Sequence, residues 1–327
     1  MHIITSRPHS LFLNQSTRNG WRSLCLTPFA CIVFLTLGTM NGVHAKISVV
    51  TSTTDLASIA RAVGGDVVNV QSLAQHTQDT HFVDARPSFL VPLSRADLVV
   101  YHGLELEVGW LPPLINNARN EKIQLGTPGN LNASTAVSKL MNVPIGAIDR
   151  SMGDIHPGGN PHFTIDPRAA IEIAKAIQDR LIAIDAGNTA TYVDNYRQFA
   201  NDVKQFSDAQ IARFSMLPKS KRRLTSYHRS LTYFADWLGL DVLLTIEIKP
   251  GIPPSPKHTA KVVREMRDKK ISLIIQENYY PRRTTSTIAR LTKAEVVIIE
   301  QVDMSKKETY IQNMTQITDE VFRVLQK

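Results

Sequence analysis

The stretch KISVVTSTTDLASIARAVGGDVVNVQSL, residues 46–73, decides the fold class of this chain. It opens with a run rich in Ile and Val (46–51), continues with apolar residues at helical spacing (55–63) and ends with a second β-branched run (67–73). A strand, a helix and a strand in this order form a unit whose two strands lie parallel. The sequence therefore predicts an α/β fold built on parallel sheets.

The same alternation continues along the rest of the chain. Further strands are expected at 97–101, 122–125, 223–226, 241–246, 271–276 and 295–299. Helices are expected at 88–95, 107–117, 230–238, 255–267, 282–291 and 309–325. Because 327 residues exceed what one ordinary core accommodates, these units are predicted to form two βα domains, 46–166 and 215–327, with a cleft between them.

The longest helical pattern, 167–214, lies between these two domains. Asp166 is a suitable N-cap and Pro167 a suitable first-turn residue, while Gly187 is a point where the helix can break or bend. About forty helical residues span on the order of 60 Å, so this segment is predicted to be a long helix that connects the domains. The preceding stretch, 126–161, is rich in Gly, Pro, Asn and Ser and is predicted to be a functional loop.

Residues 1–45 have the pattern of a cleavable secretory signal. Arginines precede an apolar run at 24–38, and Val43-His44-Ala45 forms a small-residue cleavage site. The apolar run is short for a membrane span and contains Pro28, which favours cleavage over anchoring. The region before the apolar run is unusually long for a signal peptide, so a start codon further downstream is an alternative. We expect an exported, periplasmic protein.

Cysteine content and charge narrow the possible functions. Cys25 and Cys31 both lie in the signal segment, so the mature chain is expected to lack disulfides, thiolate ligands and a lipid-bearing cysteine. The formal charge of +8 is spread along the chain, with its densest run at 219–223 and no basic stripe with interleaved aromatics. Nucleic-acid binding is therefore not expected, and any metal must be held by nitrogen and oxygen atoms.

Three histidines occupy positions where a metal site can form. His81 follows the second predicted strand, His162 precedes the long helix, and His228 follows the first strand of the second half. Open α/β sheets bind ligands beyond the carboxyl ends of their strands. A single histidine is weak evidence, but three from distant segments are predicted to converge on one cleft.

Five segments carry a resemblance to a known family. They are QDTHFVDARP (78–87), YHGLELEVGW (101–110), GDIHPGGNPHFTIDP (153–167), TSYHRSLTYFADWLGL (225–240) and EIKPGIPPSP (247–256). In this order, over essentially the whole mature chain, they resemble the metal-binding receptors of ABC importers for zinc and manganese, the cluster A-I substrate-binding proteins. The resemblance implies two βα domains joined by one long helix. It also implies a monomer that delivers metal to an ABC permease with its cytoplasmic ATPase.

The resemblance implies metal ligands at His81, His162 and His228. His156 lies in the same motif as His162 and is expected to be a less favoured ligand, and His102 is expected not to bind metal. Relatives supply a fourth, carboxylate ligand after the last strand, where this chain has Glu300 as the best equivalent. Asp303, Glu277 and water are the alternatives for that position.

Ligand chemistry favours zinc over manganese. Three imidazoles suit a tetrahedral Zn²⁺ site, whereas the harder Mn²⁺ prefers more carboxylate. Two other functions remain open. Three histidines and a water also describe a zinc-dependent hydrolase, although the sequence has no HExxH pair. The same fold could also serve an adhesin or a receptor for an organic solute. The expected function is metal capture without enzymatic activity.

Overall fold

The computed structural model describes residues 45–141, 156–248 and 251–327. The predicted signal segment, apart from Ala45, lies outside these ranges, as does part of the predicted loop 126–161. Among the described helices, none combines the length and the apolar character that crossing a bilayer would require.

The first half contains a four-stranded parallel sheet in the order β2-β1-β3-β4. Its strands are β1 (Ile47–Thr51), β2 (Val68–Ser72), β3 (Leu98–Tyr101) and β4 (Asn130–Asn132). Its helices are α1 (Thr54–Gly64), α2 (Leu90–Arg95) and α3 (Leu111–Asn117). The predicted strands at 46–51, 67–73 and 97–101 are confirmed to within two residues.

The fourth strand differs from the prediction. Residues 121–123 form a short 3₁₀ helix. Asn120 caps its N-terminus, and the Asn120 side chain accepts a hydrogen bond from the Lys122 amide. The strand β4 instead lies within the segment predicted to be a loop. It contains two asparagines, and the Asn130 amide donates to the Ile123 carbonyl at 2.8 Å. The backbone of β4 pairs in parallel with β3, and this side-chain bond ties the strand to the preceding 3₁₀ helix.

The second half repeats the design with sheet order β6-β5-β7-β8, again all parallel. Its strands are β5 (Arg223–Ser226), β6 (Asp241–Thr245), β7 (Leu273–Glu277) and β8 (Glu295–Ile299). Its helices are α6 (Thr232–Leu238), α7 (Pro256–Asp268), α8 (Arg282–Thr292) and α9 (Tyr310–Leu325). The predicted α/β class with two parallel sheets is therefore confirmed.

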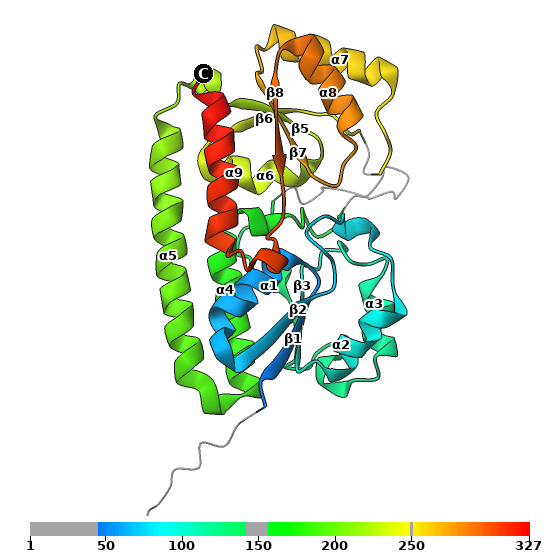
Figure 1. Ribbon diagram of the computed structural model, residues 1–327, viewed down its shortest axis with the longest axis vertical. Coiled ribbons are helices and arrows are strands. Elements are labelled where there is room, and N and C mark those ends of the chain that lie inside the picture. Colours follow the sequence, from blue (N-terminus) through cyan, green and yellow to red (C-terminus); the bar gives the residue numbers. More distant parts are fainter. Residues whose placement is uncertain (1–44, 142–155, 249–250) are drawn as a thin grey trace, which may run out of the picture. The chain divides into compact units, whose positions relative to one another are not determined.

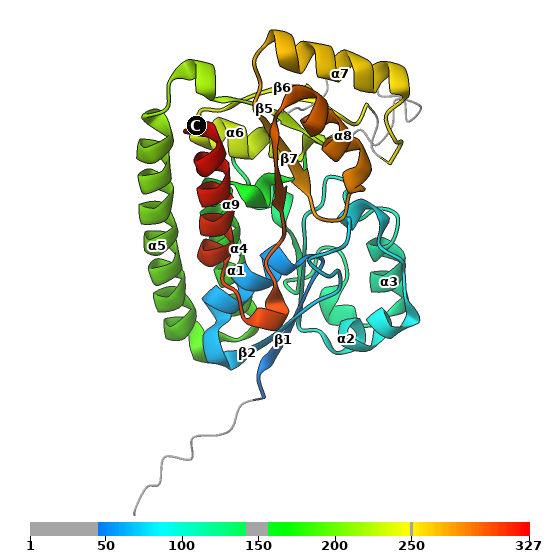
Figure 2. The same ribbon diagram turned by 45° about the horizontal axis from the view of Figure 1, so that its top comes forward.

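The helical pattern of 167–214 is present as two helices. Helix α4 (Pro167–Ile184) packs on the first sheet, and the longer α5 (Thr189–Ser215) runs beside α4, α1, α6 and α9 (Figures 1 and 2). The interruption lies at Asp185, whose carboxylate accepts hydrogen bonds from the Asn188 side chain at 2.7 Å and from the Tyr192 hydroxyl at 2.5 Å. These bonds stabilise a turn of 3₁₀ helix beside Gly187, the residue predicted to break the helix.

Three apolar clusters fill the space between these layers. The largest contains residues of both sheets, among them Val49, Leu98, Leu224 and Ile275, together with α1, α4, α5, α6 and α9. A second cluster covers the other face of the first sheet under α2 and α3, and a third covers the second sheet under α7 and α8. Because the largest cluster is continuous across both halves, the two sheets share one core. The predicted boundaries at 166 and 214 remain predictions.

Candidate metal centre

A cavity of about 80 Å³ lies where loops from both sheets meet. Segments that follow β1, β2, β3, β5, β7 and β8 line it, in agreement with the rule that open α/β sheets bind ligands at the carboxyl ends of their strands. His81, His102 and His162 lie in its wall together with Glu277 and Glu300. The cavity therefore brings together residues from distant parts of the sequence.

His81 lies on a short 3₁₀ helix (Thr80–Phe82) after β2. Asp79 caps this helix, and its Oδ1 atom accepts from the His81 backbone amide at 3.0 Å and contacts the ring Nδ1 at 2.6 Å. Burial of Asp79 opposes its ionisation, but the bonds to His81 outweigh it and lower the pKa of Asp79. A charged carboxylate at Nδ1 holds the proton there, which assigns Nε2 as the nitrogen able to bind a metal.

His162 lies directly before the 3₁₀ helix Phe163–Ile165 that leads into α4. The Asn160 side chain accepts from the His162 amide at 2.9 Å, and the ring of Phe163 is fully buried in the core. Two anchors thus fix the backbone on either side of the imidazole. Burial, and then the nearby histidines, lower the pKa of His162 well below its ordinary value. The neutral form, which binds metals, is therefore favoured.

His228 lies between β5 and the 3₁₀ helix Arg229–Leu231 and is 5% exposed. Its Nδ1 lies 2.8 Å from the buried Glu247 carboxylate, and its Nε2 lies 3.2 Å from Nε2 of His162. The ring centroid of His81 lies 5.4 Å from that of His228 and 5.1 Å from that of His162. The three histidines predicted from the sequence thus lie side by side.

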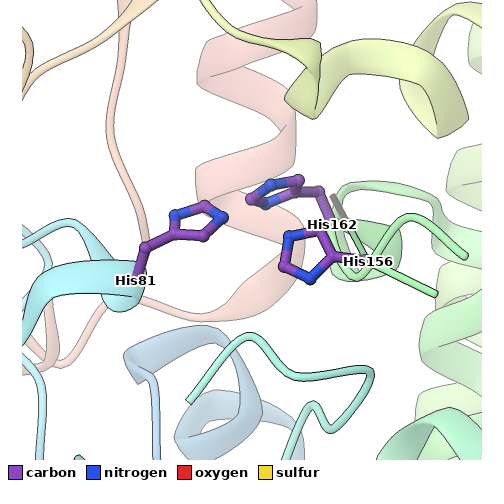
Figure 3. A group of neighbouring side chains, drawn as sticks. All are labelled: His81, His156 and His162. Atoms are coloured by element: carbon purple, nitrogen blue, oxygen red, sulfur yellow. The ribbon is translucent and has the colours of Figure 1, made fainter. Parts of the chain in front are cut away.

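His156 is a fourth member of this cluster, although the sequence analysis ranked it as a less favoured ligand. Ring nitrogens of His81, His156 and His162 all lie within 4.8 Å of one another, and Figure 3 shows the three rings pointing toward a common centre. His156 precedes His162 by six residues, with Pro157, Gly158 and Gly159 between them. This turn-forming sequence was the available signal that the chain folds back and brings both rings together.

The carboxylates considered as a fourth ligand occupy different surroundings. Glu300 lines the cavity but is exposed. Asp303 caps a 3₁₀ helix and bonds to Ser305 and Lys306, with His76 at 3.8 Å. Glu277 accepts a hydrogen bond from the Ser230 hydroxyl, and its burial raises its pKa. Among the described residues, none of these carboxylates belongs to the group whose ligand atoms meet.

His102 lines the same cavity and is buried. It is 4% exposed, with Nδ1 at 3.4 Å from Glu107 and Nε2 at 3.4 Å from the Thr164 hydroxyl. The Thr164 hydroxyl in turn faces Asp55 at 3.5 Å. His102 thus belongs to a buried polar chain, and its exclusion from the metal ligands stays a prediction.

A family model matches most of this chain. The model described as "Zinc-uptake complex component A periplasmic" matches residues 49–323, which include both sheets and all four clustered histidines.

Individual relatives are distant but extend over most of the chain. A metal ABC transporter substrate-binding lipoprotein from Streptococcus parasanguinis is 24% identical over 83% of this chain and 85% of its own length. An iron ABC transporter substrate-binding lipoprotein from Streptococcus pyogenes serotype M1 is 23% identical, over 81% of this chain and 83% of its own. The crystal structure of ZnuA superposes with a TM-score of 0.71 at 20% identity, over 86% of this chain and 99% of that one, which shows a common fold.

Proposed function

We propose that this chain captures Zn²⁺ at the histidine cluster and delivers it to an ABC importer. The chain belongs to the family of periplasmic zinc-uptake components, and this membership is the basis of the proposal. The family and its curated relatives establish the coarser function, which is that of a metal-binding substrate-binding protein. The relatives' names mention iron as well as metal in general, so the choice of zinc rests on the chemistry of this chain's own residues.

The strongest support for the proposal is the distance between the Nε2 atoms of His162 and His228. Ligand atoms that share a tetrahedral zinc ion at 2.0–2.1 Å lie about 3.3 Å apart. The Nε2 atoms of His162 and His228 are 3.2 Å apart, so this edge of a tetrahedron exists before the metal arrives. His81 completes the three proposed ligands, with its ring held by Asp79. Glu300 remains the fourth ligand predicted from the sequence.

Imidazole ligands favour zinc over manganese. Imidazole nitrogen is a borderline-soft donor that suits Zn²⁺, whereas Mn²⁺ prefers oxygen. The carboxylates of Asp79 and Glu247 hydrogen-bond to the Nδ1 atoms of His81 and His228 rather than facing the common centre. In that role they make the rings stronger donors without becoming ligands themselves.

Capture and release follow from this chemistry. Neutral imidazoles bind the ion, and protonation of the rings competes with it, so affinity decreases as the solution is acidified. The proposed receptor is a periplasmic monomer that carries one ion to the membrane permease, and the ATPase on the cytoplasmic side supplies the energy for import.

A competitive zinc titration with a chromophoric chelator tests the proposal. We expect one tightly bound Zn²⁺ per chain and a loss of at least a hundredfold in affinity in each of His81→Ala, His162→Ala and His228→Ala. His258→Ala is the matched control, since His258 lies on α7 and contacts the Thr245 carbonyl at 3.4 Å. Unchanged affinity in the three variants would contradict the site, and tighter binding of Mn²⁺ than Zn²⁺ would contradict the choice of metal.

A zinc-dependent hydrolase is the competing function. Both relatives described above are named as transporter components, which favours transport. Hydrolysis of activated esters by the zinc-loaded protein, lost in His162→Ala, would instead support an enzyme.

A further inference from the structure

His156 is held in the same manner as the proposed ligands beside it. Its Nδ1 lies 2.7 Å from the Leu104 backbone carbonyl, which can only accept a hydrogen bond. The ring of His156 must therefore carry its proton on Nδ1, and Nε2 becomes the metal-binding nitrogen. The Asp79 carboxylate likewise lies against Nδ1 of His81, and the Glu247 carboxylate lies against Nδ1 of His228. An oxygen acceptor behind Nδ1 is the usual companion of a histidine that binds metal.

The backbone that supplies this carbonyl has an unusual conformation. Gly103, Leu104 and Glu105 have φ values of 79°, 53° and 66°, and the left-handed region is unfavourable for the two residues that are not glycine. The buried Glu107 carboxylate stabilises the turn by accepting from the amides of His102 at 2.8 Å and Gly103 at 3.1 Å. A strained conformation held by dedicated bonds is a feature of functional sites. Here it directs the Leu104 carbonyl at His156.

The turn that carries His156 is fitted to the same place. The Gly159 amide donates to the His156 carbonyl at 3.1 Å, and Gly159 has a φ of 118°, which only glycine adopts readily. At Gly158 an added Cβ would lie 2.6 Å from a methyl group of Leu104. Gly158 thus allows the turn to lie directly against Leu104 and places the His156 ring opposite His81.

The resulting positions suit a shared ion. The ring centroids of His81 and His156 are 5.5 Å apart, and those of His156 and His162 are 6.4 Å apart with their planes at 87°. The Nε2 atoms of His81 and His156 are both buried from solvent. The group of ligand atoms that lie within 4.8 Å of one another contains His81, His156 and His162, and His228 adjoins it through the 3.2 Å separation of its Nε2 from Nε2 of His162. Glu300, in contrast, is exposed and lies outside this group.

We propose that His156 is the fourth metal ligand, so that the site holds its ion with four imidazole nitrogens and no carboxylate. This inference rests on the proposed function, since it concerns the same ion. Its consequence is selectivity: a site with four nitrogens and no anionic oxygen favours Zn²⁺ over the harder Mn²⁺ more strongly than one that includes Glu300.

X-ray absorption at the zinc edge, combined with zinc and manganese titrations, tests this inference. Wild-type protein is expected to show four nitrogen neighbours at 2.0–2.1 Å. His156→Ala is expected to show three nitrogens and a water oxygen, at least a tenfold loss of zinc affinity and a smaller preference for zinc over manganese. His258→Ala, on α7, is the matched control and is expected to keep the wild-type spectrum and affinity. Glu300→Gln tests the rival fourth ligand and loses affinity only if Glu300 binds the ion.

A second variant tests the support of His156 without removing its ring. Gly159→Ala forces a residue with a Cβ into a φ of 118° and so distorts the turn; it is expected to weaken zinc binding several-fold, with thermal unfolding of the metal-free protein showing that the fold persists. Three imidazole nitrogens and one oxygen in the wild-type spectrum, with wild-type affinity in His156→Ala and a loss in Glu300→Gln, would overturn the inference. If the proposed function itself is wrong, the wild-type protein binds no stoichiometric zinc, and this result distinguishes the two failures.

Discussion

The Glu247 carboxylate lies 2.8 Å from Nδ1 of His228, and both side chains are buried. The second oxygen of Glu247 accepts from the Gly251 amide at 2.7 Å, so this carboxylate links the loop after β6 to the histidine cluster. It is a positioning residue for His228 and does not belong to the group of proposed ligands.

Glu247→Gln is therefore expected to reduce zinc affinity. Replacing the carboxylate with a neutral amide of the same shape weakens His228 as a donor, and such changes cost roughly 10–100-fold in metal affinity. Competitive titration measures the effect. Glu265→Gln, on the exposed side of α7, is the control and should leave affinity unchanged. Equal affinities in both variants would show that Glu247 does not act through His228.

The metal-free protein is expected to lose stability as the pH falls from 7.5 to 5.5. Burial, and then the neighbouring histidines, lower the pKa of His162 in the folded state, whereas in the unfolded chain it lies near 6.5. The unfolded state therefore binds more protons as the pH passes below about 6.5, which favours unfolding. Melting temperatures with a chelator present measure the trend. It should be weaker in His162→Gln, and an equally steep trend there would assign it to other groups.

Asp55→Ala is expected to destabilise the fold by about 1–3 kcal/mol. Asp55 lies in the first turn of α1 and accepts from the buried Val302 amide at 3.0 Å, which ties α1 to the segment after β8. Removing the acceptor leaves this amide buried without a partner. Asp55→Asn keeps an oxygen and should cost less. Denaturant unfolding of the metal-free protein compares the two with Asp208→Ala, an exposed control on α5. Equal losses in all three would contradict the role of Asp55.

Tyr310→Phe is expected to cost about 0.5–1.5 kcal/mol. The Tyr310 hydroxyl donates to the Thr164 carbonyl at 2.8 Å and so connects the start of α9 to the turn that follows His162. Denaturant unfolding measures the loss, with Tyr196→Phe on the partly exposed face of α5 as the control. If the bond also steadies His162, zinc affinity should fall slightly in the first variant alone.

The sequence predicted most of the architecture because hydrophobic periodicity reports directly on burial. The strand at 295–299 is rich in aliphatic residues, and both it and the strand at 223–226 agree with the prediction to the residue. The strand Asn130–Asn132 was missed because it is three residues long and has no β-branched residue, so only its backbone pairing with β3 defines it. The break at Asp185 likewise depends on bonds to Asn188 and Tyr192, although Gly187 indicated its place.

In the candidate site, too, the sequence predicted some residues and the three-dimensional structure was needed for others. Strand ends pointed to His81 and His228, and the start of the long helix pointed to His162, while the family resemblance implied that all three are ligands. The role proposed for His156 depends on the conformation of Gly103, Leu104 and Glu105, which the segment YHGLELEVGW does not reveal by pattern. Glu300 was chosen by its position after the last strand, and its exposure became visible only in three dimensions.

The segment after β8 has a practical consequence. It contacts α1 through Asp55 and Val302 before α9 returns along the second sheet, so the two halves are joined on one side by this segment and by α5 (Figure 2). A fluorescent zinc sensor made by attaching one dye to each half would therefore report only a small change in dye separation. An environment-sensitive dye near the exposed ring of Phe82, next to His81, is the better design for a biosensor.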